Sequence, residues 1–335
     1  MIITTCGYGN SGASAVLDFL KGYDEIRIID DVEFQIVHMP DGLLDLRNAL
    51  LNPNGRLGST SAIYRFERLK YSNFAKGIKK LGCNYDSYSD EFINTLDAIT
   101  WNGYSVFDPI DLFNYKYNDL FFFIRKICLH YARKFNLKHR PFFHKRYFSI
   151  MDKEQFDCLA KDFISKLLKG ISVNSDEKVV LDMLFSTMDS QRGVEFFDDN
   201  VKTIIVSRDP RDVYLYSNLH PYVSAFLPYD DVNQFIQYFR MLRKNEVKNK
   251  GALYINFEDL IYNYYETTSK IMSYLEIPSR PANEFKYFNP DISVRNTFPF
   301  QSSENKKCVR SIESELSDYL YDFPSYKSPV DKRGI

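Results

Sequence analysis

The chain has 335 residues, of which 44% are hydrophobic, so it is long and apolar enough to bury a large core. Its formal net charge of -1 excludes the overall attraction to nucleic acid that a strongly basic chain would have. The aromatic stretch 112–135 carries six charged residues, which excludes a membrane-spanning helix there.

The five cysteines show no CxxC spacing and no even-numbered framework. We therefore expect buried thiols, no disulfides and a reducing compartment. Residues 1–6 have the pattern of a core strand, without the basic and apolar segments of a secretory signal. We expect a cytoplasmic protein, and we leave open a peripheral contact at the inner face of the membrane.

Apolar runs and helical patterns alternate along most of the chain. Strands are predicted over 2–5, 26–29, 178–182, 202–207 and 252–257. Helices are predicted over 14–21, 231–248, 259–275 and 312–320, with Asp231 and Asp259 as N-caps. Strands that alternate with helices predict an α/β fold with a doubly wound parallel sheet, similar to that of P-loop NTPases.

Residues 43–170 break this alternation. Helical patterns cover 61–81, 112–135 and 153–168, with little strand between them. We expect a large helical insertion that covers the substrate side of the sheet, within a single domain over 1–335.

The loop 7–14 follows the first strand directly. Its glycines allow a sharp turn that points several N–H groups at one place, and the following helix adds its positive end, so an anion is favoured there. Gly7 and Gly12 have the spacing of a Walker loop, but Ala13 stands where the lysine is required, which disfavours an ordinary nucleoside triphosphatase. A plain turn between strand and helix is the alternative.

The segment 207–212 follows another buried strand and contains Arg208, Pro210 and Arg211. Pro210 suits the first turn of a helix, so Arg208 is fixed at the end of its strand with a bidentate donor directed at the sheet edge. In a parallel sheet this edge is the one that carries the loop 7–14, so the two segments can converge on one ligand. An ion pair with a carboxylate is the alternative for each arginine.

At these segments the chain resembles the sulfotransferase family, whose donor is 3′-phosphoadenosine-5′-phosphosulfate (PAPS). The resemblance depends on residues 7–14, on 206–213 (Val-Ser-Arg-Asp-Pro-Arg-Asp-Val) and on 253–260 (Leu-Tyr-Ile-Asn-Phe-Glu-Asp-Leu), in the family's order. It implies a bacterial member of the carbohydrate type that uses PAPS and needs no metal. The donor-binding residues that it implies are Gly9, Asn10, Ser11, Gly12, Ala13, Ser14, Arg208, Ser217 and Arg295.

Two positions depart from the family pattern. The family's first loop carries a Lys or Arg that contacts the transferred group, whereas this loop has Asn10 and no cation. A serine normally follows the segment's arginine by eight residues; that position is Tyr216, and Ser217 comes one residue later. Either a small shift of the helix brings Ser217 to the ligand, or Tyr216 donates instead.

The catalytic base is expected shortly after the first helix, as in the family. Glu33 is the first choice because it follows the second predicted strand, and His38 is the second because its ordinary pKa suits a base. Asp41 follows them, and Asp182 can orient the base or the acceptor. Each residue can instead be an ordinary solvated, capping or hydrogen-bonded group without a catalytic role.

Residues 125–146 carry eight Lys and Arg and no Asp or Glu. We expect a segregated positive surface, with interleaved aromatic residues that stack on sugar rings or belong to the core. Such a surface can bind a polyanionic glycan, an anionic membrane face or nucleic acid, or it can be exposed to solvent alone. His139 and His144 have no acidic or cysteine partner nearby in the sequence, so we expect no metal site.

Three functions follow from these patterns. The leading one is a PAPS-dependent sulfotransferase acting on a carbohydrate hydroxyl of a bacterial surface glycan. The second is a P-loop kinase or other phosphotransferase, which would need a metal and a phosphate-binding lysine. The third is a non-catalytic nucleotide-binding protein of the same fold, which the missing loop cation favours.

Overall fold

A computed structural model describes residues 1–53, 55, 57–103, 118–136, 144–174, 177–198, 200–277, 280–297 and 305–324. The chain forms two compact units. The first contains Met1–His38 and Ile171–Ile335, and the second contains Met39–Gly170.

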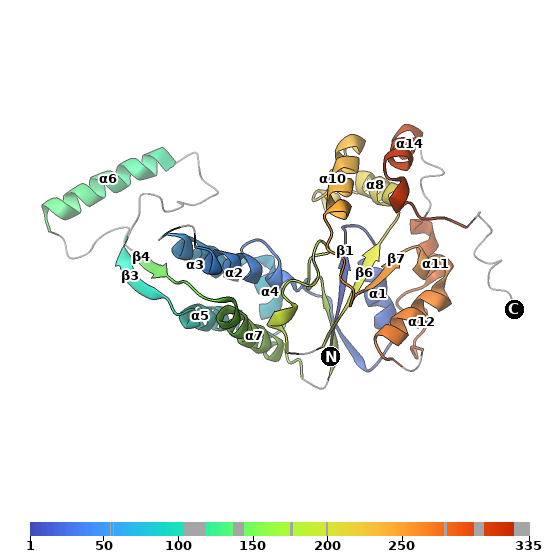
Figure 1. The fold of residues 1–335 in the computed structure, drawn as a ribbon, viewed down its shortest axis with the longest axis horizontal. Coiled ribbons are helices and arrows are strands. Elements are labelled where there is room, and N and C mark those ends of the chain that lie inside the picture. The colour runs from blue at the N-terminus through green and yellow to red at the C-terminus, as the bar shows by residue number, and fades with distance from the viewer. Residues whose placement is uncertain are drawn as a thin grey trace. The chain divides into compact units, whose positions relative to one another are not determined.

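The first unit is built on a five-stranded sheet with the order β2-β5-β1-β6-β7 (Figure 1). The strands are β1 (Ile2–Gly7), β2 (Ile26–Ile29), β5 (Lys178–Asp182), β6 (Val201–Ser207) and β7 (Leu253–Asn256). All neighbouring pairs are parallel, and β1 is central, with Thr5 opposite both Asp182 and Ile204. The predicted parallel α/β sheet is therefore confirmed.

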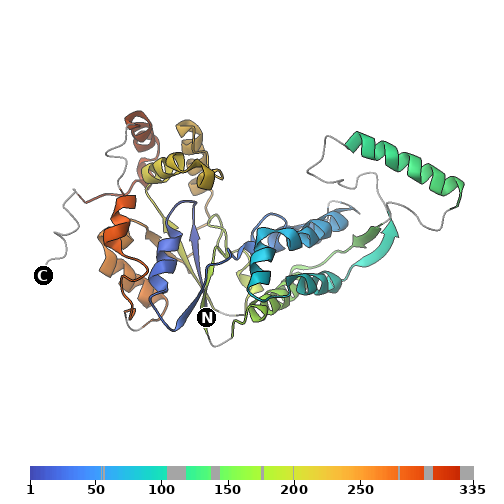
Figure 2. The ribbon, with the colours of Figure 1, turned by 180° about the vertical axis from the view of Figure 1, so that it is seen from behind.

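Both faces of the sheet are buried, as parallel sheets require. Ile3, Val180 and Ile204 belong to one core cluster with residues of α1 (Ala13–Leu20) and α12 (Tyr264–Tyr274). Figure 2 shows α1 lying over this face of the sheet. Side chains alternate along a strand, so Ile2 and Cys6 point to the opposite face, where they are also buried.

A second core cluster joins three helices of the first unit. It contains residues of α8 (Pro210–Leu219), α10 (Val232–Lys244) and α14 (Lys306–Glu315), with Phe235 and Ile312 fully buried. Asp209 and Asp231 cap α8 and α10, because their side chains accept hydrogen bonds from the first free N–H groups. Short helices complete the unit: α9 (Pro221–Ser224), α11 (Asp259–Tyr262), α13 (Pro290–Ser293), η1 (Gln35–Val37), η4 (Val194–Phe196), η5 (Val294–Asn296) and η7 (Ser317–Tyr319).

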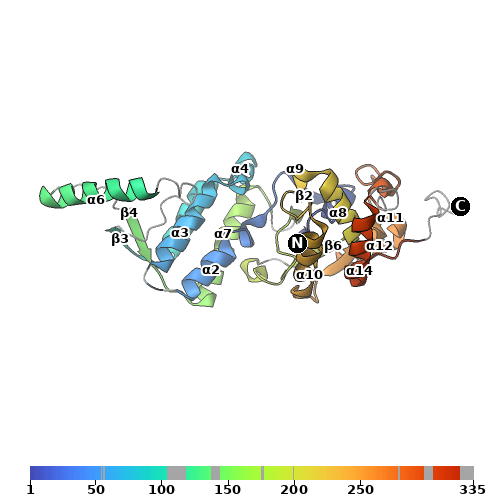
Figure 3. The same cartoon turned by 90° about the horizontal axis from the view of Figure 1, so that it is seen from above.

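The second unit is mainly helical. Its helices are α2 (Leu43–Leu51), α3 (Gly58–Arg68), α4 (Asn73–Lys80), α5 (Tyr85–Thr95), α6 (Asn118–Lys134) and α7 (Lys153–Gly170), with the short η2 (Leu69–Tyr71). In Figure 3, α2 lies beside α3 and α7. In the core of this unit the Phe92 and Phe163 rings are stacked, and Phe66 packs against both. The unit also contains an antiparallel pair, β3 (Ile99–Gly103) and β4 (His144–Phe148), which the helical pattern did not predict.

Several predicted boundaries are wrong for local reasons. The predicted helix 61–81 is interrupted at Ser72, whose backbone is extended and whose hydroxyl caps α4. The predicted helix 259–275 is interrupted at Asn263, whose φ of -124° and ψ of 39° are not helical. The last helix lies over Lys306–Glu315, earlier than the predicted 312–320. Cys158 is exposed, against the expectation of buried thiols.

Candidate functional site

The loop after β1 adopts the conformation of an anion cradle. Gly9, Asn10 and Gly12 all have positive φ, at 86°, 51° and 83°. A Cβ at Gly12 would lie 2.5 Å from the Phe257 ring, so only glycine fits there. Ser11 fixes the turn, because its Oγ accepts a hydrogen bond from Tyr8 N at 3.0 Å. The chain then enters α1, whose N-terminal end adds positive potential to the loop.

The Arg208 guanidinium meets this loop. Its Nη1 donates to the Asn10 carbonyl at 2.9 Å, and its Nη2 donates to the Asn296 carbonyl at 2.5 Å. The residue is 8% exposed, and its buried Nε has no hydrogen-bond partner among the described residues. Burial lowers the pKa of Arg208, while the negative charge of Asp212 opposes that shift. The two segments that the sequence places at one sheet edge are in direct contact there.

Asn10 ties the loop to α8 and α9. Its amide donates to Ser217 Oγ and to Ser224 Oγ, both at 2.9 Å. Ser217 is fully buried, and its hydroxyl donates to the Val213 carbonyl at 2.7 Å. Tyr216 instead places its ring 5.5 Å from the Arg208 guanidinium carbon. Of the two candidates left open by the sequence, Ser217 is therefore the one in contact with the loop.

Arg211 has the structural role that the sequence offered as an alternative. Its Nη2 and Nε donate to the Asp209 carboxylate, and its Nη1 donates to Glu313 at 2.9 Å. A bidentate buried pair of this kind fixes the start of α8, which directly follows Arg208.

Glu258 lies beneath this segment and was not predicted as part of the site. Its Oε1 accepts a hydrogen bond from Asp209 N at 2.8 Å, whereas its buried Oε2 has no partner among the described residues. Burial raises the pKa of Glu258 to about 8. The protonated acid therefore prevails at neutral pH, and the Glu-Asp-Leu sequence after β7 is the signal that could have identified it.

A second guanidinium approaches the loop from α10. The Arg243 guanidinium lies 4.1 Å from the Tyr8 ring centroid and 5.4 Å from that of Tyr319. Arg243 also pairs with Glu246, whose carboxylate accepts from the Tyr8 hydroxyl at 2.8 Å. Arg208 and Arg243 line one cavity of about 340 Å³, which lies among β6, β7, α10 and the segment 318–322. Nothing in the sequence singled out Arg243.

The predicted base residues gather at the carboxyl end of β5. Glu33 is exposed and accepts a hydrogen bond from the Gln35 amide. His38 Nε2 lies 2.9 Å from the Met183 carbonyl, and burial lowers the pKa of His38. Asp182 Oδ1 accepts from Thr5 Oγ1 at 3.0 Å. Burial and the nearby Glu33 charge raise the pKa of Asp182 to about 6.

Two further candidates occupy ordinary positions. Asp41 forms an ion pair with Arg65 at 2.7 Å in the second unit. Arg295 is exposed on η5, although the neighbouring Asn296 carbonyl accepts from Arg208.

The basic block 125–146 is not one continuous positive surface. Arg125 and Arg146 are buried, which corrects that expectation. Lys126, Arg133, Lys134 and Lys145 are exposed, whereas Lys138, His139 and Arg140 lie outside the described residues. The exposed ring of Tyr131 on α6 is stacked with that of Phe135, which directly follows the helix, with centroids 6.1 Å apart.

Within the described part of the chain, no group of three His, Cys, Asp or Glu side chains is arranged to hold a metal ion. Within the same part, no helix has the length and hydropathy of a membrane span.

Neither a family model nor a curated protein matches the chain. The solved structures that are similar to it include two sulfotransferase domains. The sulfotransferase domain from the Synechococcus PCC 7002 olefin synthase is 12% identical with a TM-score of 0.41, covering 97% of this chain and 95% of that one. The sulfotransferase domain from the curacin biosynthetic pathway is 14% identical with a TM-score of 0.40, covering 97% and 98%.

Proposed function

We propose that the protein is a sulfotransferase that moves a sulfuryl group from PAPS to a hydroxyl acceptor. One observation carries the proposal: the buried Arg208 guanidinium lies 2.9 Å from the carbonyl of Asn10, inside the amide-rich loop. A backbone cradle and a buried cation at one sheet edge can hold the two anionic ends of one nucleotide.

The residues at this edge suit such a donor. Under the proposal the loop from Gly9 to Gly12, Ala13 and Ser14 at the start of α1 hold the 5′ phosphosulfate end. Arg208 and Ser217 hold the 3′-phosphate, which replaces the carbonyl oxygens that Arg208 now contacts. Arg208 Nε is buried and has no partner within the described part of the chain, so it can donate to the phosphate. Arg295 closes over the nucleotide from η5.

A missing loop cation is the main departure from the family pattern. We assign that charge to Arg243, which stacks on Tyr8 of the loop and shares a cavity with Arg208. Bound PAPS supplies an activated sulfuryl group, and the chain's own groups have to position it and donate to its oxygens.

We propose Asp182 as the group that accepts the acceptor's proton. Its pKa of about 6 leaves it ionised at neutral pH and close enough to pH 7 to act as a base. In this assignment burial and the neighbouring Glu33 charge keep the pKa of Asp182 raised. Glu33 and His38 remain the alternative candidates that the sequence predicted. Substitution of each of the three residues in turn distinguishes them.

The acceptor class is a carbohydrate hydroxyl, as on a bacterial surface glycan. The stacked Tyr131 and Phe135 rings with Lys126 and Arg133 on α6 suit sugar rings and acidic substituents. Contact of α6 with an anionic polymer or membrane surface and a cytoplasmic location stay predictions. Transfer of labelled sulfate from PAPS to polysaccharide, but not to simple alcohols, would support this acceptor class.

A thermal-shift comparison tests the function itself. We expect 3′-phosphoadenosine-5′-phosphate (PAP) to raise the melting temperature without magnesium, and ATP with magnesium to have no such effect. The reverse pattern would favour a phosphotransferase. Binding of PAP without turnover of PAPS on any acceptor would favour a non-catalytic nucleotide-binding protein. The hydrogen bonds from the Asn10 amide to Ser217 and Ser224 also support that alternative.

A further inference from the structure

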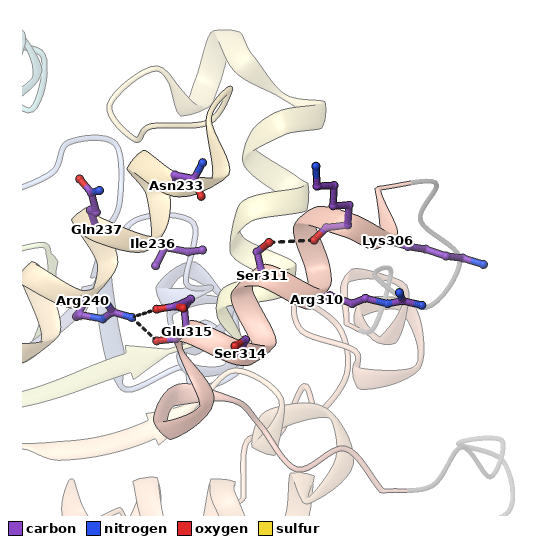
Figure 4. Close-up of a pocket in the computed structure, with 10 residues that line it drawn as sticks. Asn233, Ile236, Gln237, Arg240, Lys306, Arg310, Ser311, Ser314 and Glu315 are labelled. Atoms are coloured by element: carbon purple, nitrogen blue, oxygen red, sulfur yellow. Dashed lines mark hydrogen bonds and ion pairs between the residues drawn. The ribbon is translucent and has the colours of Figure 1, made fainter.

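A basic groove lies between α10 and α14, apart from the residues assigned to the donor and to the base. Its volume is about 810 Å³. Asn233, Ile236, Gln237 and Arg240 of α10 line one side, and Lys306, Lys307, Arg310, Ser311, Ser314 and Glu315 of α14 line the other (Figure 4).

The lining has an excess of positive charge. One pair is internal, because Arg240 donates to the Glu315 carboxylate at 2.7 Å. Lys306, Lys307 and Arg310 are exposed and form no ion pair with any carboxylate in the described ranges. In Figure 4 the Lys306 and Arg310 side chains extend from α14 on the side away from α10, so their charged ends are exposed beside the groove rather than between the two helices.

This placement opposes the local electrostatics of the helix. Lys306 and Lys307 occupy the first turn of α14, which has no acidic residue. Helix N-termini favour anions and disfavour cations, so the positive helix end and three cations reinforce one another. The opposite face of α14 supplies the folding contacts, because Val309, Ile312 and Leu316 are buried there. The exposed side chains of Lys306, Lys307 and Arg310 are therefore not needed to hold α14 in place.

The other lining groups indicate the chemistry of the ligand. Amides of Asn233 and Gln237 and hydroxyls of Ser311 and Ser314 bind hydroxyl-rich molecules. Among the described residues of the lining, Ile236 is the one aliphatic side chain and none is aromatic. An inserted lipid chain or a protein anchor would need more apolar surface, and unpaired nucleic-acid bases would need stacking rings.

We propose that this groove binds an acidic polysaccharide that carries sulfate or carboxylate groups. The cations contact the anionic substituents, while the amides and hydroxyls contact the sugar hydroxyls. This binding does not depend on the proposed transfer activity, because it uses none of the residues assigned to the donor or the base.

The test uses the full chain and a fluorescein-labelled heparin oligosaccharide, with binding followed by fluorescence polarisation at several salt concentrations. The variant Lys306→Gln/Lys307→Gln/Arg310→Gln removes the three cations. The matched control Arg192→Gln/Lys250→Gln/Lys286→Gln removes one exposed Arg and two exposed Lys elsewhere in the same unit. We expect the first variant to bind roughly ten-fold more weakly or worse and with a shallower salt dependence, and the control to bind like the wild type.

A second variant keeps the test decisive if the triple variant folds poorly. Ser314→Glu places a carboxylate at an exposed groove position while all the cations remain, and it should weaken heparin binding several-fold. An equal loss of heparin binding in the control variant would overturn the proposal. A loss of heparin binding that occurs only when Lys126, Arg133 and Lys134 of α6 are replaced would also overturn it. So would tighter binding of a DNA duplex than of heparin, or unchanged binding in both groove variants.

Discussion

At the scale of single residues, the protein combines a buried guanidinium group with carboxyl groups whose pKa values are raised. Arg208 is held among carbonyl oxygens and carboxylates, and Glu258 and Asp182 are carboxyl groups whose pKa values burial raises. The positions of Arg208 and Glu33 at the sheet edge follow from the strand pattern. The contacts of Glu258 and Arg243 do not, because each depends on side chains from distant segments.

Glu258 makes stability depend on pH. Its pKa is about 8 in the folded protein and about 4.3 in an unfolded chain. Its contribution to the free energy of unfolding is therefore fully present below pH 4.3 and is lost as pH rises to 8, at up to about 1.4 kcal/mol per pH unit. Glu258→Gln keeps the acceptor for Asp209 N and should flatten this decline in urea unfolding between pH 6.5 and 8. An equal slope in both proteins would refute the assignment.

Asp182 should set the acidic limb of the activity profile. If Asp182 is the base, kcat/KM rises as pH increases through about 6, because the carboxylate is the active form. Asp182→Asn should remove turnover and retain PAP binding, whereas Glu33→Gln should move the limb to lower pH because a neighbouring negative charge is lost. Loss of turnover in Glu33→Gln with an active Asp182→Asn would return the role to Glu33. Loss confined to His38→Gln would assign it to His38.

At the scale of elements, the apolar runs of the buried strands were sufficient to predict where these strands begin and end. The observed β2 and β5 have the predicted limits, 26–29 and 178–182. The antiparallel pair β3 and β4 was missed because four of the five β3 residues are exposed, so no apolar alternation marks the strand. The hydrogen bonds from Asn10 to Ser217 and Ser224 join elements more than 200 residues apart, and no local pattern predicts them.

The loop between β1 and α1 should be intolerant of a side chain at Gly12. Gly12→Ala combines a positive φ with a Cβ placed 2.5 Å from Phe257, and we expect a loss of about 1–3 kcal/mol in stability together with weaker PAP binding. Gly58→Ala is the control, because Gly58 begins α3 with open space around it and should be neutral or slightly stabilising. Chemical denaturation of both variants measures the contrast. Equal stability would show that the loop tolerates a different conformation.

Capping of α10 offers a change in stability that should leave the donor site intact. Asp231 accepts from the backbone of Asn233 and Gln234, so Asp231→Ala should cost about 1 kcal/mol. PAP binding measured below the melting transition should not change. A large loss of affinity would mean that α10 and its Arg243 are less firmly placed than their core contacts indicate.

At the scale of the whole molecule, the account depends on convergence within the first unit. Segments around residues 10, 208, 217 and 296 reach one edge of one parallel sheet, although they are widely separated in sequence. The rule that parallel strands present their carboxyl ends at one edge predicted the meeting of the first two. It did not predict that the Asn10 amide would donate a hydrogen bond to the Ser217 hydroxyl.

Isothermal titration of PAP in magnesium-free buffer tests the central claim most directly. We expect the wild type and Arg192→Ala to bind, and Arg208→Ala to lose at least about 30-fold in affinity, because loss of a buried charged partner costs about 2–5 kcal/mol. Circular dichroism of Arg208→Ala checks that the fold is retained. Arg208→Lys, which keeps the charge, is a second control for the fold. Binding of PAP by Arg208→Ala with wild-type affinity would contradict the account.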